Sequence, residues 1–483
     1  MRSLLPILCI CLLFFSCKRD TAWYTASGYP KPVSDIIMTR CSVSGCHNDQ
    51  SYQASGGLNL STWNHLFEGG NGGSVAIPYR DDQSWLQFFI NTNPANGTML
   101  TPTMPNGSNP LSAADQAVLA QWINAGAPNY QGQVAFASDP VREKYYVVNQ
   151  GCDVVTVFDA HTKLAMRYID VGITGSIEGP HDILVSPDNQ YWYVVFFANG
   201  TVIQKFRCSD DVLVGNITVP AGSWSTLEIS ADGSRGFAVD YNGSVAYLDL
   251  DHLHLLDYYS GGTQFTRPHG LAASADFKTM YVTEEYGNHI FRVAVDGQNI
   301  TNIGFPIPLS ANASDSLDPH QIIFSPDFSK YFVSCQLSNE VRVMDAATNT
   351  LIQAIPVGTK PQEFAVSKTH PYLFVTCMED GSAFPKSKGS VYVINYNTLQ
   401  VVKVLQDGML YQPHGIQVDD ENGWVIIPNT NANPNGPAPH HVSYCGGRNG
   451  FVRLVDLNTL GFLPDYKAEV SVNPYEVAVR LRP

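Results

Sequence analysis

The residues most specific for chemistry lie between positions 41 and 47. This segment reads Cys41-Ser42-Val43-Ser44-Gly45-Cys46-His47, so that a histidine directly follows the second cysteine. Two thiols with an adjacent imidazole are what covalent haem attachment uses: the sulfurs form thioethers and the imidazole binds the iron. The spacer is longer than usual, but it can bulge away from the ring while both sulfurs reach it. A small disulfide loop or half of a zinc site is the alternative, and the Cys-His adjacency favours haem c.

A methionine is the expected second ligand of the iron. Thioether sulfur is a soft ligand that raises the potential of haem iron. Met104 lies in the segment Thr103-Met104-Pro105-Asn106-Gly107, and Met99 is the alternative. Either methionine alone is also consistent with packing, since methionine commonly fills cores. The position between the Cys-His motif and a closing helix favours Met104.

Two helices are predicted to flank these ligands. After Pro32, apolar residues at helical spacing lead directly into the motif: Val33, Ile36 and Ile37. A second helix is predicted from Ser112, which forms a capping box with Asp115, to a stop at Gly126. Its buried face is expected to contain Leu111, Ala114, Val118, Leu119, Trp122 and Ile123. We therefore expect a small all-α cytochrome c domain at residues 31–129.

Further motifs follow the Cys-His motif in a fixed order. They are Gly56-Gly57-Leu58-Asn59-Leu60-Ser61, the glycine-rich stretch 69–73, Ile77-Pro78, Met104-Pro105 and Trp122-Ile123-Asn124-Ala125-Gly126-Ala127. The ordered set resembles planctomycete-type cytochrome c domains, which are also common in exported Bacteroidetes proteins. The resemblance covers residues 31–129 and implies an iron held by His47 and Met104.

Composition and charge narrow the classes of protein. The chain has 483 residues, of which 44% are hydrophobic and 15% charged, with 39 glycines and 30 prolines. This length predicts two or more domains, and the composition favours a turn-rich, all-β body. The net charge of −15 argues against nucleic acid as a partner, because phosphate binding needs a basic face.

The N-terminus has the pattern of an export signal. Arg2 precedes an apolar stretch at 4–15 that is too short for a membrane span, and Cys17 follows it. This resembles a lipoprotein signal at residues 1–17, with lipidation of Cys17 and a tether at 18–30, although Phe15 is larger than usual. An ordinary secretory signal is the alternative. Both place the protein outside the cytoplasm, and the first predicts a periplasmic or outer-membrane lipoprotein with a lipid anchor.

The remaining cysteines are an odd number. Once Cys9, Cys11, Cys17, Cys41 and Cys46 are assigned to the signal, lipid and haem, five are left: Cys152, Cys208, Cys335, Cys377 and Cys445. At least one is therefore expected to be a free thiol or a metal ligand.

Repeats dominate the chain after a linker at residues 130–140. Aromatic-rich strands such as Tyr145-Tyr146-Val147-Val148-Asn149 recur at intervals typical of propeller blades. Inner strands are predicted near His181, Trp224, His269, His320, Gln362, His414 and Tyr475. The last belongs to the first blade, so that the C-terminal strand closes the ring and leaves no free edge. The repeats resemble seven-bladed YVTN-type propellers, and we predict an all-β seven-bladed propeller at residues 141–483.

Four inner strands begin with Pro-His, which predicts a ring of histidines on one face: His181, His269, His320 and His414. Cys335, Cys377, Glu284, Glu285 and His289 are expected on the same face, together with an insertion at 429–449 that carries His440, His441 and Cys445. Imidazoles with soft sulfur nearby suit copper or haem chemistry. The alternative is a repeat consensus in which Pro-His caps a strand and the cysteines are small buried hydrophobes.

The histidine ring is similar to the copper site of nitrous oxide reductase, whose propeller also has seven blades. Here, however, Trp224, Gln362 and Tyr475 replace three of the histidines, and no cupredoxin-type copper domain follows. Nitrite reductases with haems c and d also join a small cytochrome to a propeller, with more blades and a different cytochrome.

These observations predict an exported c-type haem protein that transfers electrons, with a redox partner protein and with haem c and copper as the cofactors to test. A non-catalytic binding propeller for a protein or glycan, with an attached haem domain, is the alternative. Whether the chain is an oxidoreductase stays open.

Overall fold

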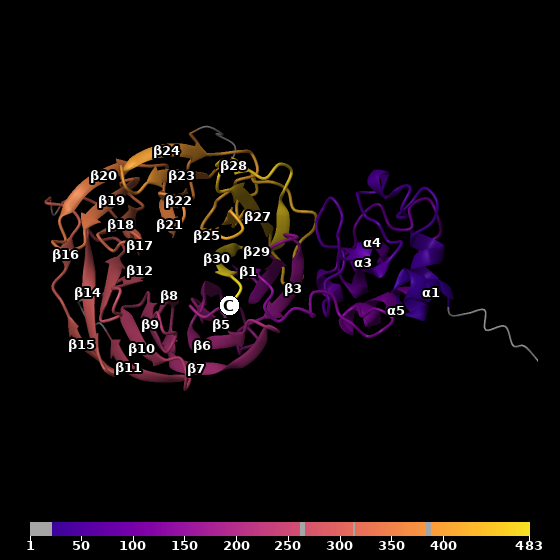
Figure 1. Cartoon of the computed structure of the whole chain (residues 1–483), viewed down its shortest axis with the longest axis horizontal. Helices are drawn as coiled ribbons and strands as arrows, with labels where there is room; N and C mark the ends of the chain where they lie inside the picture. Colours follow the sequence, from indigo (N-terminus) through magenta and orange to yellow (C-terminus); the bar gives the residue numbers. More distant parts are fainter. Residues whose placement is uncertain (1–21, 261–265, 313, 383–387) are drawn as a thin grey trace, which may run out of the picture.

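The chain folds into a helix- and loop-containing N-terminal region and a ring of β-sheets (Figure 1). The structure is a computed structural model that describes residues 22–260, 266–312, 314–382 and 388–483. Cys17 and the predicted signal segment lie outside the described residues. Among the residues that are described, no helix has the length and apolar character needed to cross a membrane.

The N-terminal region (residues 22–130) contains five short α-helices: α1 (Ala22–Ser27), α2 (Lys31–Ile36), α3 (Trp63–Leu66), α4 (Trp85–Ile90) and α5 (Ala113–Asn124). A π-helical turn, Ile37–Cys41, continues α2 into the Cys-His motif, and three short 3-10 turns cover Tyr52–Ala54, Asp81–Gln83 and Pro94–Asn96. The side chain of Ser112 accepts a hydrogen bond from the backbone of Asp115 at the start of α5, as a capping box requires. Leu119, Trp122 and Ile123 of α5 are buried, whereas Ala114 is exposed.

The prediction of a small all-α cytochrome c domain at residues 31–129 is wrong. The described chain is nearly all-β, and the N-terminal region is mostly irregular backbone between short helices, of which α5 is the longest at 12 residues. Gly56, Gly57, Gly69 and Gly73 have positive φ angles between 70° and 104°, a conformation that interrupts helices. The region also packs against the sheets, since Ser74 donates a hydrogen bond of 2.6 Å to the carbonyl of Ala165. It is therefore not a separate all-α unit.

Seven sheets form the propeller in the described part of the chain. Blade 1 contains β1 (Lys144–Asn149), β2 (Val154–Asp159), β3 (Ala165–Asp170) and β30 (Pro474–Arg480). Blade 2 contains β4 (Pro180–Val185), β5 (Tyr191–Phe196), β6 (Gly200–Arg207) and β7 (Val212–Gly222). Blade 3 contains β8 (Trp224–Ile229), β9 (Arg235–Asp240), β10 (Ser244–Asp249) and β11 (His254–Ser260). Blade 4 contains β12 (Pro268–Ala273), β13 (Thr279–Glu284), β14 (His289–Asp296), β15 (Asn299–Ile303) and β16 (Ile307–Pro308).

The other three blades complete the ring. Blade 5 contains β17 (Pro319–Phe324), β18 (Lys330–Cys335), β19 (Glu340–Asp345) and β20 (Leu351–Pro356). Blade 6 contains β21 (Pro361–Val366), β22 (Tyr372–Cys377), β23 (Ser390–Asn395) and β24 (Gln400–Leu405). Blade 7 contains β25 (Gln417–Asp419), β26 (Trp424–Asn429), β27 (Asn449–Asp456), β28 (Gly461–Phe462) and β29 (Ala468–Val472). The seven-bladed ring predicted from the repeats is therefore present.

The C-terminal strand β30 joins the two ends of the propeller. It pairs antiparallel with β1, with Lys144 opposite Arg480 and Val147 opposite Val477, and it is the inner strand of blade 1 (Figure 1). Buried apolar side chains fill the spaces between neighbouring blades: Tyr146 of blade 1, for example, belongs to one cluster with Trp192 and Phe206 of blade 2. A ring closed in this way leaves no incomplete blade and only the outer strands as edges, so it can hold its inner strands rigidly.

Candidate functional site

The N-terminal region encloses a cavity of about 650 Å³ (the N-terminal cavity). Cys41, Cys46, His47 and Met104 all line it, whereas Met99 does not, and Met99 is 47% exposed. Apolar and aromatic side chains form much of the rest of the wall: Leu58, Leu60, Val75, Trp85, Leu86, Phe89 and Ile90. The sequence-predicted haem residues are thus brought to one cavity of the size and lining that cofactor sites have.

The Cys-His segment folds as a closed turn that presents its functional atoms to this cavity. The backbone amide of His47 donates to the carbonyl of Cys41 at 3.2 Å, and the amide of Cys46 donates to that of Val43 at 3.0 Å. Nδ1 of His47 lies 3.1 Å from the carbonyl oxygen of Leu58. A proton on Nδ1 makes that hydrogen bond and leaves the lone pair of Nε2 free for a metal.

Burial shifts the pKa values of Cys41 and His47 toward their neutral forms. It raises the pKa of the Cys41 thiol to about 12, so that without a bound metal ion Cys41 is a neutral thiol. Cys41 and Cys46 are free cysteines. Burial lowers the pKa of His47, which keeps its imidazole neutral and able to act as a ligand.

Met104 is held in the wall of the N-terminal cavity by a backbone hydrogen bond as well as by packing. Its amide donates to the carbonyl of Phe89 at 2.8 Å, and its side chain packs against the buried core of the N-terminal region. The residues present therefore fit a covalent c-type haem: Cys41 and Cys46 for attachment, with His47 and Met104 as iron ligands. Such a group would supply one-electron redox chemistry.

The second candidate site is the histidine cluster (His181, His269, His320 and His414) at the propeller axis. Ring centroids lie 4.0 Å apart for His269 and His320, 5.4 Å for His181 and His269, and 5.5 Å for His320 and His414. All four residues are at most 4% exposed. The four histidines predicted to share one face therefore converge.

The repeat itself aims these rings at the axis. In blades 2, 4 and 5 the pairing register shifts just after the Pro-His pair, between Pro180 and Ile183, Pro268 and Leu271, and Pro319 and Ile322. Such bulges re-aim side chains. Hydroxyl groups of neighbouring strands then hold the backbone at these histidines. The hydroxyl of Thr283 donates to the backbone carbonyl oxygen of His320 at 2.8 Å, and the hydroxyl of Thr376 donates to that of His414 at 2.6 Å.

His320 stands between two carboxylates. Its Nδ1 lies 2.7 Å from Oε1 of Glu285, and its Nε2 lies 3.4 Å from Oε1 of Glu363. Burial lowers the pKa of His320, but the hydrogen bonds to the two carboxylates outweigh burial and raise that pKa to about 9. Burial, reinforced by the charge of His320, lowers the pKa of His269 to about 4. Without a bound ion, a proton on His320 therefore supplies the positive charge that the carboxylates need.

Two cavities meet at the histidine cluster. An outer cavity of about 590 Å³ is lined by Tyr241, Glu285, His181, His269, His320, Gln362 and Tyr475, among others. An inner channel cavity of about 190 Å³ contains Asp182, Glu228, Glu363, His414 and Glu476. The pKa of Asp182 is raised to about 7 and that of Glu228 to about 8, in both cases chiefly by burial. The cluster thus lies between an open mouth and an acidic channel.

Other residues expected on this face lie elsewhere. His440 packs on Trp85 and His441 on Phe88, with ring centroids 4.6 Å and 4.8 Å apart, so both contact the N-terminal region. Cys445 pairs with Cys152 in a disulfide. The prediction that the insertion covers the histidine cluster is therefore wrong for these side chains, because neither cavity at the cluster includes any of them. The disulfide and the aromatic contacts hold the insertion against blade 1 and the N-terminal region instead.

The remaining predicted ligands are also displaced. Cys335 and Cys377 end β18 and β22 as predicted, but both are fully buried, and neither lines a cavity at the cluster. Glu284 accepts from the backbone of Thr266 and Arg267, and His289 packs on Phe291. With Cys208, the two strand-end cysteines are free thiols.

Sequence reasoning missed Glu363. It follows Gln362 in Pro361-Gln362-Glu363, where blade 6 has glutamine in place of the repeated histidine. In several blades the residue directly after the histidine position lines the channel cavity. These residues are Asp182, Gln321 and Glu476, in addition to Glu363. Aligning that second position across the blades is the signal that could have found it.

Comparisons with known proteins identify the fold and leave the activity open. No family model matches the chain. Antigen Lp49 of Leptospira interrogans is 26% identical over 172 residues, which cover 33% of this chain and 36% of that protein. The chain therefore spans about a third of the length of the curated relative that it matches.

Two solved structures are similar to the propeller. A functionally unknown protein from Desulfotomaculum acetoxidans superposes with a TM-score of 0.54 at 15% identity, covering 70% of this chain and 99% of that one. Hydrazine synthase from Kuenenia stuttgartiensis superposes with a TM-score of 0.49 at 17% identity, covering 64% and 93%. The first of these likenesses supports the propeller fold.

Proposed function

We propose that this chain is an exported c-type haem protein that transfers electrons, and that its propeller carries a His-rich metal or redox site. The observation that carries the proposal is the N-terminal cavity, in which Cys41, Cys46, His47 and Met104 meet from positions up to 63 residues apart. A methionine that only fills the core would not need to face the same cavity as the Cys-His motif, whereas an iron ligand would.

The role of each residue follows from its chemistry. The thiols of Cys41 and Cys46 would form the thioethers, and Nε2 of His47, freed by the bond from Nδ1 to Leu58, would bind the iron. The sulfur of Met104 would complete the ligand pair and keep the potential high. The largely apolar wall would limit the contact of a bound haem with water, which also favours a high potential.

Export belongs to the same proposal. Haem c is attached outside the cytoplasm, and the disulfide between Cys152 and Cys445 is typical of an oxidising compartment. A redox partner protein would dock near the N-terminal cavity, and Cys17 would anchor the chain to a membrane by lipid. The distinctive histidines converge at the propeller axis, as a metal or redox site requires, and not on an outer surface where a protein or glycan would bind. This placement favours the redox function over a non-catalytic binding module.

The test is covalent attachment. The chain is produced in the periplasm of a host that matures c-type haem, and haem is stained on a denaturing gel. Staining is expected for the wild type and for a Cys335→Ala control, and it should vanish for the double variant Cys41→Ser, Cys46→Ser. Staining that survives the double substitution, or an unstained wild type, would reject haem c.

A further inference from the structure

We infer that His269, His320 and Glu363 form a mononuclear centre for one divalent first-row metal ion, with coordination positions left open to a small-molecule ligand. The inference rests on the proposed His-rich metal site and names its ligands and its class of ion. It differs from a ring of four histidines, because a carboxylate of blade 6 takes part and His181 does not.

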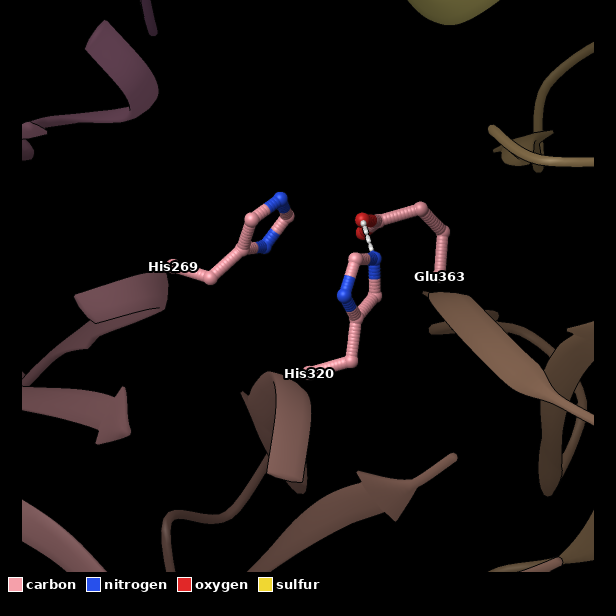
Figure 2. A group of neighbouring side chains, drawn as sticks. All are labelled: His269, His320 and Glu363. Atoms are coloured by element: carbon pink, nitrogen blue, oxygen red, sulfur yellow. Dashed lines mark ion pairs between the residues drawn. The ribbon is translucent and has the colours of Figure 1, made fainter. Parts of the chain in front are cut away.

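The three side chains converge from adjacent blades. One ligand atom from each lies within 4.8 Å of the others, and Figure 2 shows the two imidazoles and the carboxylate directed toward a common space. Their residues are 4%, 3% and 7% exposed. β12, β17 and β21 of blades 4, 5 and 6 supply them, so that three rigid inner strands fix the geometry.

The ligand atoms are short of partners. Within the described residues, Nδ1 of His269 makes no hydrogen bond although it is buried, and the contact of Nε2 of His320 is the 3.4 Å ion pair with Oε1 of Glu363. A buried polar atom without a partner costs about 1–3 kcal/mol in ordinary sites, and such atoms are rare in native structures. A cation at this point would satisfy both nitrogens and the Glu363 carboxylate together.

Groups behind the ligands hold them in place. Glu285 binds Nδ1 of His320 at 2.7 Å and is itself bound by Gln336 at 2.9 Å and by Tyr241 at 2.8 Å. A carboxylate behind a histidine fixes the tautomer that presents the other nitrogen to a metal. Gln321 donates to Oε2 of Glu363 at 2.7 Å, which leaves Oε1 facing His320.

A competing triad shares Glu363 but is a poorer site. Glu363, His414 and Glu476 also come within 4.8 Å of one another. No carboxylate holds His414 as Glu285 holds His320, since neither nitrogen of His414 has a hydrogen-bond partner among the described residues. The ring of His414 stacks on Tyr475 instead, with ring centroids 3.6 Å apart.

The donor set and its surroundings indicate the kind of ion. Two imidazoles and one carboxylate, without sulfur, suit borderline divalent ions such as Fe²⁺, Co²⁺ and Zn²⁺. Three protein ligands leave positions free, as in catalytic rather than structural metal sites. The outer cavity of about 590 Å³ borders His269 and His320, so a small molecule can reach those positions.

The experiment is calorimetric titration of the metal-stripped, haem-containing full chain with Zn²⁺ alone. One ion per chain is expected. Glu363→Gln and His269→Gln should each weaken binding by roughly 100-fold or more, and Glu285→Gln by roughly 10- to 100-fold. His289→Gln, a histidine of blade 4 that lies outside the cluster, is the matched control and should leave the affinity unchanged. Circular dichroism and the thermal midpoint establish that each variant is folded.

The outcomes separate this inference from the haem proposal. No Zn²⁺ binding by the folded wild type overturns the metal centre whether or not haem is attached. Loss of binding in folded His414→Gln and Glu476→Gln with full affinity in His269→Gln would also overturn it, in favour of the competing triad. Stoichiometric binding that depends on Glu363 and His269 supports it, including in a wild-type preparation that proves to lack haem.

Discussion

The N-terminal cavity and the histidine cluster are two ways of bringing ligands together. At the cavity, three of the four predicted haem residues lie within seven positions of the chain, and irregular loops bring Met104 to them. At the cluster, residues as far apart as His181 and His414 meet because each occupies one position of a repeated blade. The first site depends on a local motif, and the second depends on the closure of a ring.

The two sites also differ in charge. The wall of the cavity is largely apolar around Cys41, Cys46 and His47. The cluster is buried with carboxylates on both sides, Glu285 toward the mouth and Glu363 toward the channel. A largely apolar wall suits a large cofactor attached by covalent bonds, whereas buried carboxylates need a cation. This difference agrees with the proposals of haem at the first site and of a small positive ion at the second.

The largest expected effect is on the visible spectrum and reduction potential of the haem when Met104, and not Met99, is replaced. Met104→Ala should abolish the sulfur-to-iron band at the red end of the oxidised spectrum and lower the potential, by part of the roughly 0.8 V range that axial ligands span. Met99→Ala is the matched control, and because its side chain lies outside the cavity its spectrum should equal that of the wild type. The visible spectrum and a redox titration measure both variants. If only Met99→Ala loses the band, the ligand assignment is wrong.

A smaller effect is expected where the two regions meet. The disulfide Cys152–Cys445 holds the insertion whose His440 packs on Trp85 at the cavity. Replacing both cysteines by serine should reduce the free energy of unfolding by about 2–4 kcal/mol, because the bond joins residues 293 positions apart. Urea unfolding followed by fluorescence measures the loss. The reduced wild type should match the variant, and equal stability of the oxidised wild type and the variant would contradict the role of the bond.

The smallest effect concerns pH and the channel. Burial, with the charge of Asp182, raises the pKa of Glu228 from 4.5 to about 8. The unfolded chain loses this proton first, so stability should fall as pH rises from about 4.5 to about 8. In Glu228→Gln that fall should be shallower, as thermal midpoints between these limits will show. Glu68→Gln, an exposed carboxyl of the N-terminal region, should keep the wild-type slope, and identical slopes for all three proteins would contradict the acidic channel.

The sequence predicted what repeats and local motifs encode. Pro-His at the start of four inner strands predicted that His181, His269, His320 and His414 lie on one face, and the strand pattern predicted seven blades, but only the structure shows that the four rings converge. Neither signal extends to Glu363, whose role depends on where β21 places it relative to a histidine of blade 5. The all-α prediction for residues 31–129 failed because two helical patterns at its ends were extended across a glycine-rich middle. The contacts of His440 and His441 with the N-terminal region could not be predicted, since no periodic pattern relates the two segments.

The most direct measurement of the central claim is the intact mass of the purified mature chain under denaturing conditions. The account predicts one haem bound covalently per chain, and therefore a single species heavier by one haem than the mature polypeptide with its lipid. The double variant Cys41→Ser, Cys46→Ser should have the mass of the lipid-bearing polypeptide without haem. A wild-type chain that also lacks the mass of the haem, from a host that attaches haem to a control cytochrome, would contradict the account.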